Sequence, residues 1–344
     1  MNYDLLRVDL AAKGYRRTEC KQCCLHTWNK DPRTHNFCGN NSCYVYPQVV
    51  PQSPQITPTR FNRALVEHFS NPREKMDFVR EVIPLRRAST ITTYSESNHV
   101  FAGLCAFEKL FLNPSPKALK NFGGKLYLDN QYCFRFDDLN QIGVTGRHCS
   151  GFTMTGLHLF ETEEHPFPDN WQAQFFDKLY RFLLTLGIGS EELRFNEDYW
   201  RGGENEGACL EIFYKGVEIG NMVFIRSHMK SQRALDVGLG LQRILFLLGY
   251  PVRYMASTYW DHLRSLMVGT KDGADCSKIG LGYAMRKLLE QILEIKKVPF
   301  EQLQEDILTV SKELETYYEG QKFVESIDKL LRIGKFEEQR INSQ

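Results

Sequence analysis

The chain of 344 residues has no excess charge of either sign and no long hydrophobic run. It holds 43 Lys and Arg residues against 42 Asp and Glu, a formal net charge of +1. This balance excludes a general electrostatic attraction to nucleic acid and leaves only local patches. No apolar run approaches the ~20 residues of a membrane helix. Because Asp4, Arg7 and Asp9 interrupt the first apolar stretch, we expect no signal peptide, no membrane partner and a cytoplasmic location.

Two common nucleotide-binding motifs are also missing. Asp236–Arg243 reads DVGLGLQR, which has Gly238 and Gly240 but lacks the third glycine of a dinucleotide fingerprint, and no Walker loop occurs. The composition, 42% hydrophobic and 25% charged, is that of a globular protein, and the length predicts about two domains. Four prolines between positions 47 and 58 predict an extended linker after an N-terminal segment.

Cysteine, in contrast, is concentrated near the start. Four of the ten cysteines have the spacing Cys20-x2-Cys23-x14-Cys38-x4-Cys43, and Cys24 is adjacent. Two close pairs on either side of a short loop are typical of a structural zinc site, so we expect these four thiolates to bind zinc. Gly39 and Asn40 occupy a turn that can require positive φ, and His26 and His35 are reserve ligands. The alternative is four unrelated reduced cysteines.

Hydrophobic spacing predicts strands in the middle of the chain and helices at both ends. Predicted helices cover residues 60–82 with a break at Asn71-Pro72, 169–186 before Gly187, 279–296, 301–318 and 323–336. Predicted strands cover residues 84–98, 126–136 and 152–159, with a hairpin at 210–226 that turns at Lys215-Gly216. Residues 235–248 predict a glycine-rich start to an apolar helix. This order favours an α+β fold, an antiparallel sheet with helices on one face.

Three stretches combine glycines with charged residues. In the first, Arg135 ends one predicted strand and Phe152 lies on the next, an arrangement that can clamp a phosphate and stack a base, or that is a plain surface hairpin. The second, 200–211, predicts either a loop whose glycines let the backbone approach a ligand or a plain polar loop. The third, 236–243, predicts anion contact at the start of a helix.

In this order the three stretches resemble the signature motifs of class II aminoacyl-tRNA synthetases, and more narrowly the archaeal-type alanyl-tRNA synthetase catalytic domain. CFRFDDLNQIGVTGRHCSGFTM (133–154) is similar to motif two, FNEDYWRGGENEGACLEI (195–212) to the glycine-rich loop and DVGLGLQRI (236–244) to motif three. With the cysteine cluster, 82–94 and 260–289, the similarity covers roughly residues 16–290. It implies an antiparallel catalytic sheet of six or seven strands flanked by helices. It also implies an N-terminal zinc-binding segment (1–50), an adenylation domain (51–255) and a C-terminal helical domain (256–344).

The resemblance also implies the nucleotide chemistry, with ATP as substrate and Mg²⁺ as cofactor. Arg135 matches the arginine that contacts the α-phosphate, Phe152 the aromatic that stacks on adenine, and Arg243 the arginine on the terminal phosphates. Arg135 and Arg243 are therefore the expected catalytic residues. The chemistry needs no protein nucleophile, so His148 and Cys149 are given no role.

For the amino acid, the resemblance implies that Asp236 pairs with the ammonium group of alanine. Trp200, Asn221 and Val223 match the pocket wall, and Glu211 matches a carboxylate for magnesium or for the pocket. Departures from the family pattern leave the exact amino acid open; they are Thr153, Glu204, Glu206, Ala208, Val237 and Gln242.

No HxxxH or CxxxH pair occurs, so we expect no editing domain. Residues 286–344 hold 10 Lys and Arg against 12 Asp and Glu, whereas a tRNA-binding surface is normally basic. Three functions therefore stay open. The first is activation of alanine and transfer to tRNA or a tRNA-like acceptor. The second is transfer to a carrier protein or small molecule in a biosynthetic pathway, and the third is a non-catalytic sensor of amino acid or tRNA. The oligomeric state is not predicted.

Overall fold

The protein is described here from a computed structural model. The described residues are 6–31, 33, 36–40, 42–43, 56–92, 99–107, 120–137, 139–146, 148–202, 205–227, 233–252, 255, 257–296, 300–318, 320–323 and 332. The chain divides into two compact units. The first comprises Met1–Leu85, Phe107–Asp129 and Thr155–Pro251, and the second comprises Arg86–Ala106, Asn130–Met154 and Val252–Gln344.

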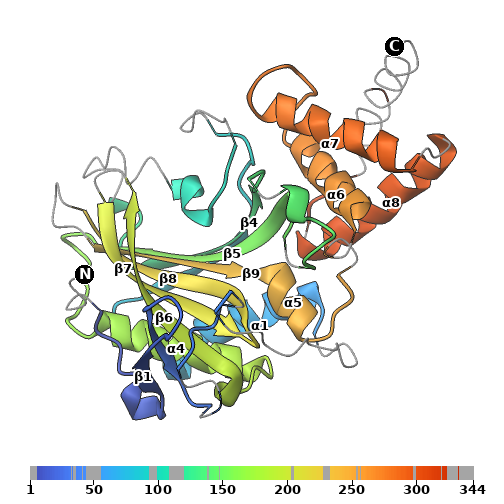
Figure 1. Ribbon diagram of the computed structural model, residues 1–344. Helices are drawn as coiled ribbons and strands as arrows, with labels where there is room; N and C mark the ends of the chain where they lie inside the picture. Colours follow the sequence, from blue (N-terminus) through green and yellow to red (C-terminus); the bar gives the residue numbers. More distant parts are fainter. Residues whose placement is uncertain are drawn as a thin grey trace. The chain divides into compact units, whose positions relative to one another are not determined.

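A nine-stranded sheet with the order β1-β2-β6-β7-β8-β9-β5-β4-β3 is the framework of the first unit (Figure 1). Its strands are β1 (Arg16–Glu19), β2 (His26–Asn29), β3 (Glu81–Arg86), β4 (Lys125–Phe134), β5 (Gly151–Phe160), β6 (Leu193–Gly202), β7 (Asn205–Tyr214), β8 (Val217–Ser227) and β9 (Arg233–Gly240). The strand pairs from β1 to β9 in this order are antiparallel. The resemblance implies six or seven strands. The sheet has nine because β1 and β2, from the cysteine-containing segment, extend it beyond β6.

Both predicted hairpins are confirmed. Strands β4 and β5 are neighbours, and their connection contains a short 3-10 turn at Leu139–Gln141. Strands β7 and β8 meet at Lys215 and Gly216, whose φ angles are 50° and 74°. Two successive positive φ values are what a two-residue hairpin turn requires, and glycine adopts them without steric cost.

Three predicted elements are wrong in their local structure. The expected loop at 200–211 is largely strand, since β6 continues to Gly202 and β7 starts at Asn205. Residues 235–240 belong to β9, so the helix after them, α5 (Leu241–Leu247), is only seven residues long. A second helix after Asn71-Pro72 is replaced by the single turn Pro72–Glu74. Residues 84–86 of the predicted strand at 84–98 belong to β3, whereas its residues 93–98 lie outside the described part of the chain.

Helices α1 (Pro58–Ser70) and α4 (Trp171–Thr185) form a layer on one face of the sheet (Figure 1). The rings of Trp171 in α4 and Phe224 in β8 are 5.4 Å apart at their centroids, as are those of Phe176 in α4 and Phe195 in β6. Helix α1 packs on α4 through aromatic rings such as Phe61 and Phe182, 5.6 Å apart. The aromatic stripe of α4 is therefore core, as its helical spacing predicts.

The second unit contains α6 (Thr258–Lys271), α7 (Gly280–Lys296) and α8 (Phe300–Tyr317), and α6 packs on both of the other two. The last two confirm the predicted helices at 279–296 and 301–318. The predicted helix at 323–336 and the proline-rich stretch before position 56 lie mostly outside the described residues. Buried Arg87 forms a bidentate ion pair with Asp272, at 2.6 and 2.7 Å. Across the described part of the chain, no helix is both long and apolar enough to span a membrane.

Candidate functional site

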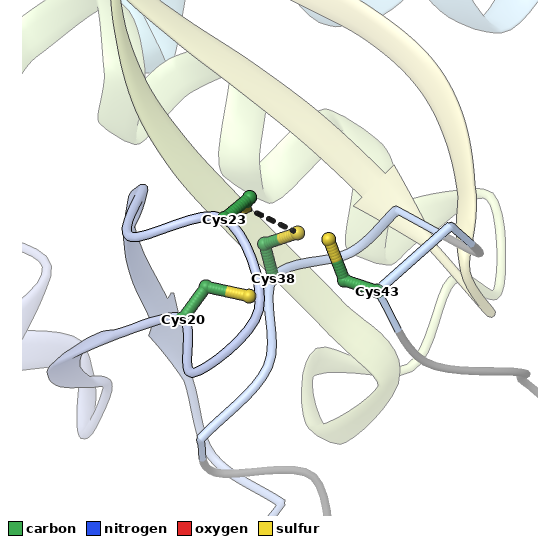
Figure 2. A group of neighbouring side chains, drawn as sticks. All are labelled: Cys20, Cys23, Cys38 and Cys43. Atoms are coloured by element: carbon green, nitrogen blue, oxygen red, sulfur yellow. Dashed lines mark hydrogen bonds between the residues drawn. The ribbon is translucent and has the colours of Figure 1, made fainter.

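The four predicted zinc ligands come together in space (Figure 2). The Sγ atoms of Cys20, Cys23, Cys38 and Cys43 all lie within 4.8 Å of one another, and the Cys23 and Cys38 sulfurs are 3.8 Å apart. All four cysteines are free thiols. A tetrahedral zinc ion with 2.3 Å bonds to sulfur separates its ligand atoms by about 3.8 Å, so the cluster fits zinc without rearrangement of the backbone.

Two tight turns aim these sulfurs at one point. In the first turn, the Cys24 amide donates to the Cys20 carbonyl at 2.9 Å, and Cys24 has a φ of 60°. In the second, the Cys43 amide donates to the Asn40 carbonyl at 3.0 Å. Positive φ therefore occurs in the first turn and not at Gly39 or Asn40. Gly39 is required for another reason, since a Cβ there would lie 2.3 Å from Cγ of Phe213.

The Cys20 thiol is prepared for ionisation. Burial opposes the charge, but backbone hydrogen bonds from Cys38, Cys23 and Gln22 outweigh it and lower the pKa of Cys20 to about 6. A thiolate is the form that binds a metal. Of the reserve ligands, His26 lies on β2 outside the cluster and His35 lies outside the described residues.

The predicted amino-acid pocket residues lie on the sheet of the first unit. Asn221 pairs directly with Glu211 on β7 and with Gly238 on β9, and Val223 pairs with Cys209 and Asp236. Residues paired across strands point to the same face, and so do residues two apart on one strand. Trp200 joins this set through its pairing with Gly207, which pairs with Ile225. One face of the sheet therefore carries all five predicted residues: Trp200, Glu211, Asn221, Val223 and Asp236.

This face is the one turned away from α4. Phe195 and Phe224, which contact α4, alternate along their strands with the five residues above. Asp198 lies on the same face as the five, because it pairs with Cys209. Three carboxylates, those of Asp198 on β6, Glu211 on β7 and Asp236 on β9, thus share this face, which makes it suitable for a cation or an ammonium group.

The fold raises the proton affinity of the Glu211 carboxylate. Burial, together with the negative charges of Glu218 and Asp198, raises its pKa to about 7. The Asn196 side-chain amide donates to Oε2 of Glu211 at 3.3 Å, which opposes the rise. Near neutral pH, Glu211 can therefore accept a metal ion or carry a proton, and the two roles expected for it stay open.

Asp236 contacts a histidine that sequence reasoning missed. Oδ1 of Asp236 lies 2.9 Å from Nδ1 of His158 on β5. Nε2 of the same ring lies 3.4 Å from Oδ1 of Asp129 on β4. A polar His158 between Leu157 and Leu159 in an apolar strand was the available signal, because a buried imidazole needs a polar partner.

Arg243 lies in α5, directly after β9. Its Nη1 donates to the Glu218 carbonyl at 3.0 Å and lies 3.7 Å from the Glu218 carboxylate. The side chain is one-third exposed. Both contacts hold the guanidinium beside the end of the β7–β8 hairpin.

Arg135 and Phe152 belong to the second unit. The Arg135 amide donates to the Ser150 carbonyl at 2.8 Å, so the arginine immediately follows β4 as predicted. Its guanidinium lies 6.0 Å from the ring centroid of Phe152, and its Nε donates to the Phe101 carbonyl at 3.0 Å. The structure thus brings the arginine and the aromatic of the predicted nucleotide clamp into contact. The structure leaves Asp138 and Arg147, in the same hairpin, undescribed.

Comparison with known proteins adds relatives with a stated activity. No protein-family model matches the chain. The alanine–tRNA ligase of Methanocella arvoryzae is 30% identical over 265 residues, 72% of this chain and 28% of that protein. That of Methanococcus aeolicus is 28% identical over 267 residues, 74% of this chain and 28% of the relative. That of Nitrosopumilus maritimus is 40% identical over 136 residues, 36% of this chain and 14% of the relative.

The chain thus spans less than a third of the length of these relatives. Two of the three matches nonetheless extend over most of this chain, and all three relatives carry the same enzyme name. The protein is therefore similar in sequence to alanine–tRNA ligases and resembles a ligase enzyme.

Proposed function

We propose that this chain activates alanine, or a close small amino acid, with ATP and transfers it to the 3′ end of a tRNA or tRNA-like acceptor. Alanine and tRNA come from the names of its relatives. The observation that carries the proposal is that Trp200, Glu211, Asn221, Val223 and Asp236 share one face of the sheet. We further propose that this sheet is a class II synthetase sheet, with residues 1–50, 51–255 and 256–344 as zinc segment, adenylation domain and helical domain.

The shared face suits the recognition of a small amino acid. Asp236 would accept the substrate ammonium, and Val223, its direct neighbour on β8, is buried and apolar. Neighbouring strands are about 4.8 Å apart, so Asp236 and Glu211, two strands apart, leave about 10 Å for the substrate. The Trp200 indole lies against Gly202, where a Cβ would be 2.5 Å from its Cζ2, and would close the side of the pocket.

The proposed reaction joins the carboxylate of alanine to the α-phosphate of ATP. An oxygen of the alanine carboxylate attacks the α-phosphorus of ATP, a new O–P bond forms, and the bond to the bridging oxygen breaks as pyrophosphate leaves. Arg135 would neutralise charge at the α-phosphate and Arg243 would hold the terminal phosphates, while Phe152 stacks on adenine. The carboxylate is already ionised at neutral pH, so no side chain needs to act as a base.

Two metal ions accompany this function. Zinc would be held by Cys20, Cys23, Cys38 and Cys43, where it would link β1 to the segment after β2 without an open position for chemistry. Magnesium, when bound with ATP, supplies charge neutralisation on the phosphates, and Glu211 is the carboxylate we propose for it or for the pocket.

The acceptor of the activated amino acid has two candidates. The resemblance of residues 260–289, which include part of α6, to alanyl-tRNA synthetases favours tRNA. The acidic balance of residues 286–344 favours a different acceptor, such as a carrier-protein thiol or a small molecule. A non-catalytic sensor is the third possibility, and it would bind the amino acid or tRNA without turnover.

ATP–pyrophosphate exchange with each of the twenty amino acids, with and without total tRNA, tests the proposal. We expect exchange with alanine, loss of it in Asp236→Asn, and stable label on tRNA. Asp177→Asn is the matched control, because Asp177 lies on α4 with a half-exposed side chain paired to Lys13. Exchange without tRNA charging would select the other acceptor. A silent panel would refute the enzymatic proposal, and full exchange in Asp236→Asn would refute the pocket.

A further inference from the structure

A buried histidine lies directly behind the proposed ammonium site. His158 on β5 is fully buried, and its two ring nitrogens meet carboxylates on the two neighbouring strands. Nδ1 is 2.9 Å from Asp236 on β9, and Nε2 is 3.4 Å from Asp129 on β4. The exposed fraction of the side chain rises along the series, from 0% at His158 through 6% at Asp129 to 17% at Asp236. Asp236 is therefore the end of the series that a ligand can reach.

The imidazole is closely packed on the side of Phe107 and at Gly156. The ring of Phe107 lies against it, with centroids 4.6 Å apart. Gly156 lies beside the Asp129 contact, where a Cβ would be 2.2 Å from Oδ1 of Asp129 and 2.3 Å from Nε2 of His158. A side chain at position 156 would separate the two partners, so glycine at this strand position permits the contact.

The charges of the three groups can be counted. Burial opposes protonation of the imidazole, but the adjacent Asp129 and Asp236 outweigh it and raise the pKa of His158 to about 10. The ring is then an imidazolium at neutral pH. Two carboxylates and one cation leave a net charge of −1, which one ammonium group bound at Asp236 neutralises. Asp129 on β4 and Asp236 on β9 are the titratable groups that face the ring among the described residues.

We propose that His158 is a positioning residue for amino-acid recognition: anchored by Asp129, it fixes the carboxylate of Asp236 in the orientation that receives the substrate ammonium. The inference rests on the proposed function, since it assigns a substrate group to Asp236. It goes beyond that function in making the affinity for the amino acid, and not for ATP, depend on a residue that the substrate never touches. A fully buried imidazolium cannot itself act as a base, so its effect passes through Asp236.

A matched pair of substitutions separates positioning from burial. The amide of His158→Asn can take the place of Nδ1 beside Asp236, whereas that of His158→Gln takes the place of Nε2 and reaches Asp129 instead. Both variants remove the cation. We expect His158→Gln to raise the KM for alanine in pyrophosphate exchange by about 10-fold, because it removes the close ionic contact of Nδ1 with Asp236. His158→Asn should raise it less, and the KM for ATP should stay constant. Equal effects of the two variants, or none, would overturn the proposal.

A second measurement does not depend on activity. Histidine ring ¹⁵N NMR, with the His158 signal identified by its loss in His158→Gln, reports the protonation state directly. We expect both ring nitrogens to be protonated at pH 8, and Asp236→Asn to lower the pKa of His158. A neutral ring at pH 7, or a pKa that does not respond to Asp236→Asn, would overturn the inference. If the wild-type chain activates no amino acid, the proposed function fails while these spectra still decide whether His158 holds Asp236.

Discussion

Glu211 gives the folded chain a pH dependence of stability that can be worked out in advance. Its pKa rises from the ordinary 4.5 to about 7 on folding, because of burial and the negative charges of Glu218 and Asp198. Between these two values the folded chain keeps a proton that the unfolded chain has released. The contribution of Glu211 to stability is therefore fully present below pH 4.5 and is lost as the pH rises through 7. From pH 5 to pH 8 the loss amounts to about 2 to 3 kcal/mol in the free energy of unfolding.

Glu211→Gln removes this dependence while keeping the shape of the side chain. Urea unfolding of both proteins, followed by tryptophan fluorescence at pH 5 and pH 8, isolates the contribution, because every other group titrates in both. We expect the stability of the variant relative to wild type to increase by about 2 to 3 kcal/mol between the two pH values. Glu218→Gln should reduce the effect, since it removes one of the charges that raise the pKa of Glu211, and Glu67→Gln on α1 should leave it unchanged. The same difference between Glu211→Gln and wild type at both pH values would refute the reasoning.

Two further predictions concern the zinc cluster and a strand glycine. Metal analysis of the purified chain should give about one zinc per chain. The zinc should be lost in the double variant Cys20→Ser with Cys23→Ser but kept in Cys24→Ser, whose thiol lies outside the group of four. A folded, metal-free wild type would contradict this prediction. Gly207→Ala should lower the free energy of unfolding by about 1 to 3 kcal/mol, because its Cβ would lie 2.0 Å from the Phe224 carbonyl oxygen. Thermal unfolding measures this change, and Gly189→Ala is the control because its Cβ would have no neighbour closer than 3.5 Å. An unchanged free energy of unfolding in Gly207→Ala would show that β7 and β8 can move apart.

The elements that the sequence predicts well are those whose signals are local. Lys215-Gly216 specifies a hairpin by its own backbone preferences, Asn71-Pro72 ends α1, and Gly187 follows α4 with a φ of 87°. Each signal acts within a few residues, so tertiary packing does not override it.

Two of the predictions that are wrong concern glycines that let neighbouring strands approach closely and do not form loops. Gly207 and Gly238 lie in stretches interpreted as a loop and as the start of a helix. In the structure, β8 approaches both of them closely: a Cβ on Gly220 would lie 2.4 Å from the Gly238 carbonyl oxygen. A glycine required by a strand that is distant in sequence cannot be told from a turn glycine by spacing alone.

The candidate site likewise contains residues that the sequence identified and residues that only the structure revealed. The resemblance to synthetases supplied Trp200, Asn221 and Asp236 one by one, but only strand register shows that they share a face. His158 and Asp129 were missed because their contact joins neighbouring strands that belong to different stretches of sequence. No local pattern states which carboxylate a buried histidine will meet.

The negative charge on the sheet face that carries Asp236 explains why we expect the substrate ammonium, and not the phosphates of ATP, to bind there. A phosphate chain would be repelled by the carboxylates of Asp198, Glu211 and Asp236, whereas an ammonium group would be attracted. The proposed phosphate ligands belong to other elements: Arg135 follows the end of β4, and Arg243 is in α5. The carboxylate of an amino acid bound at Asp236 would meet less repulsion when Glu211 holds its proton, as it does below about pH 7. The raised proton affinity of Glu211 therefore acts in the same direction as the buried cation at His158. Each reduces the negative charge around the substrate, and neither removes the carboxylate of Asp236 that binds the substrate ammonium.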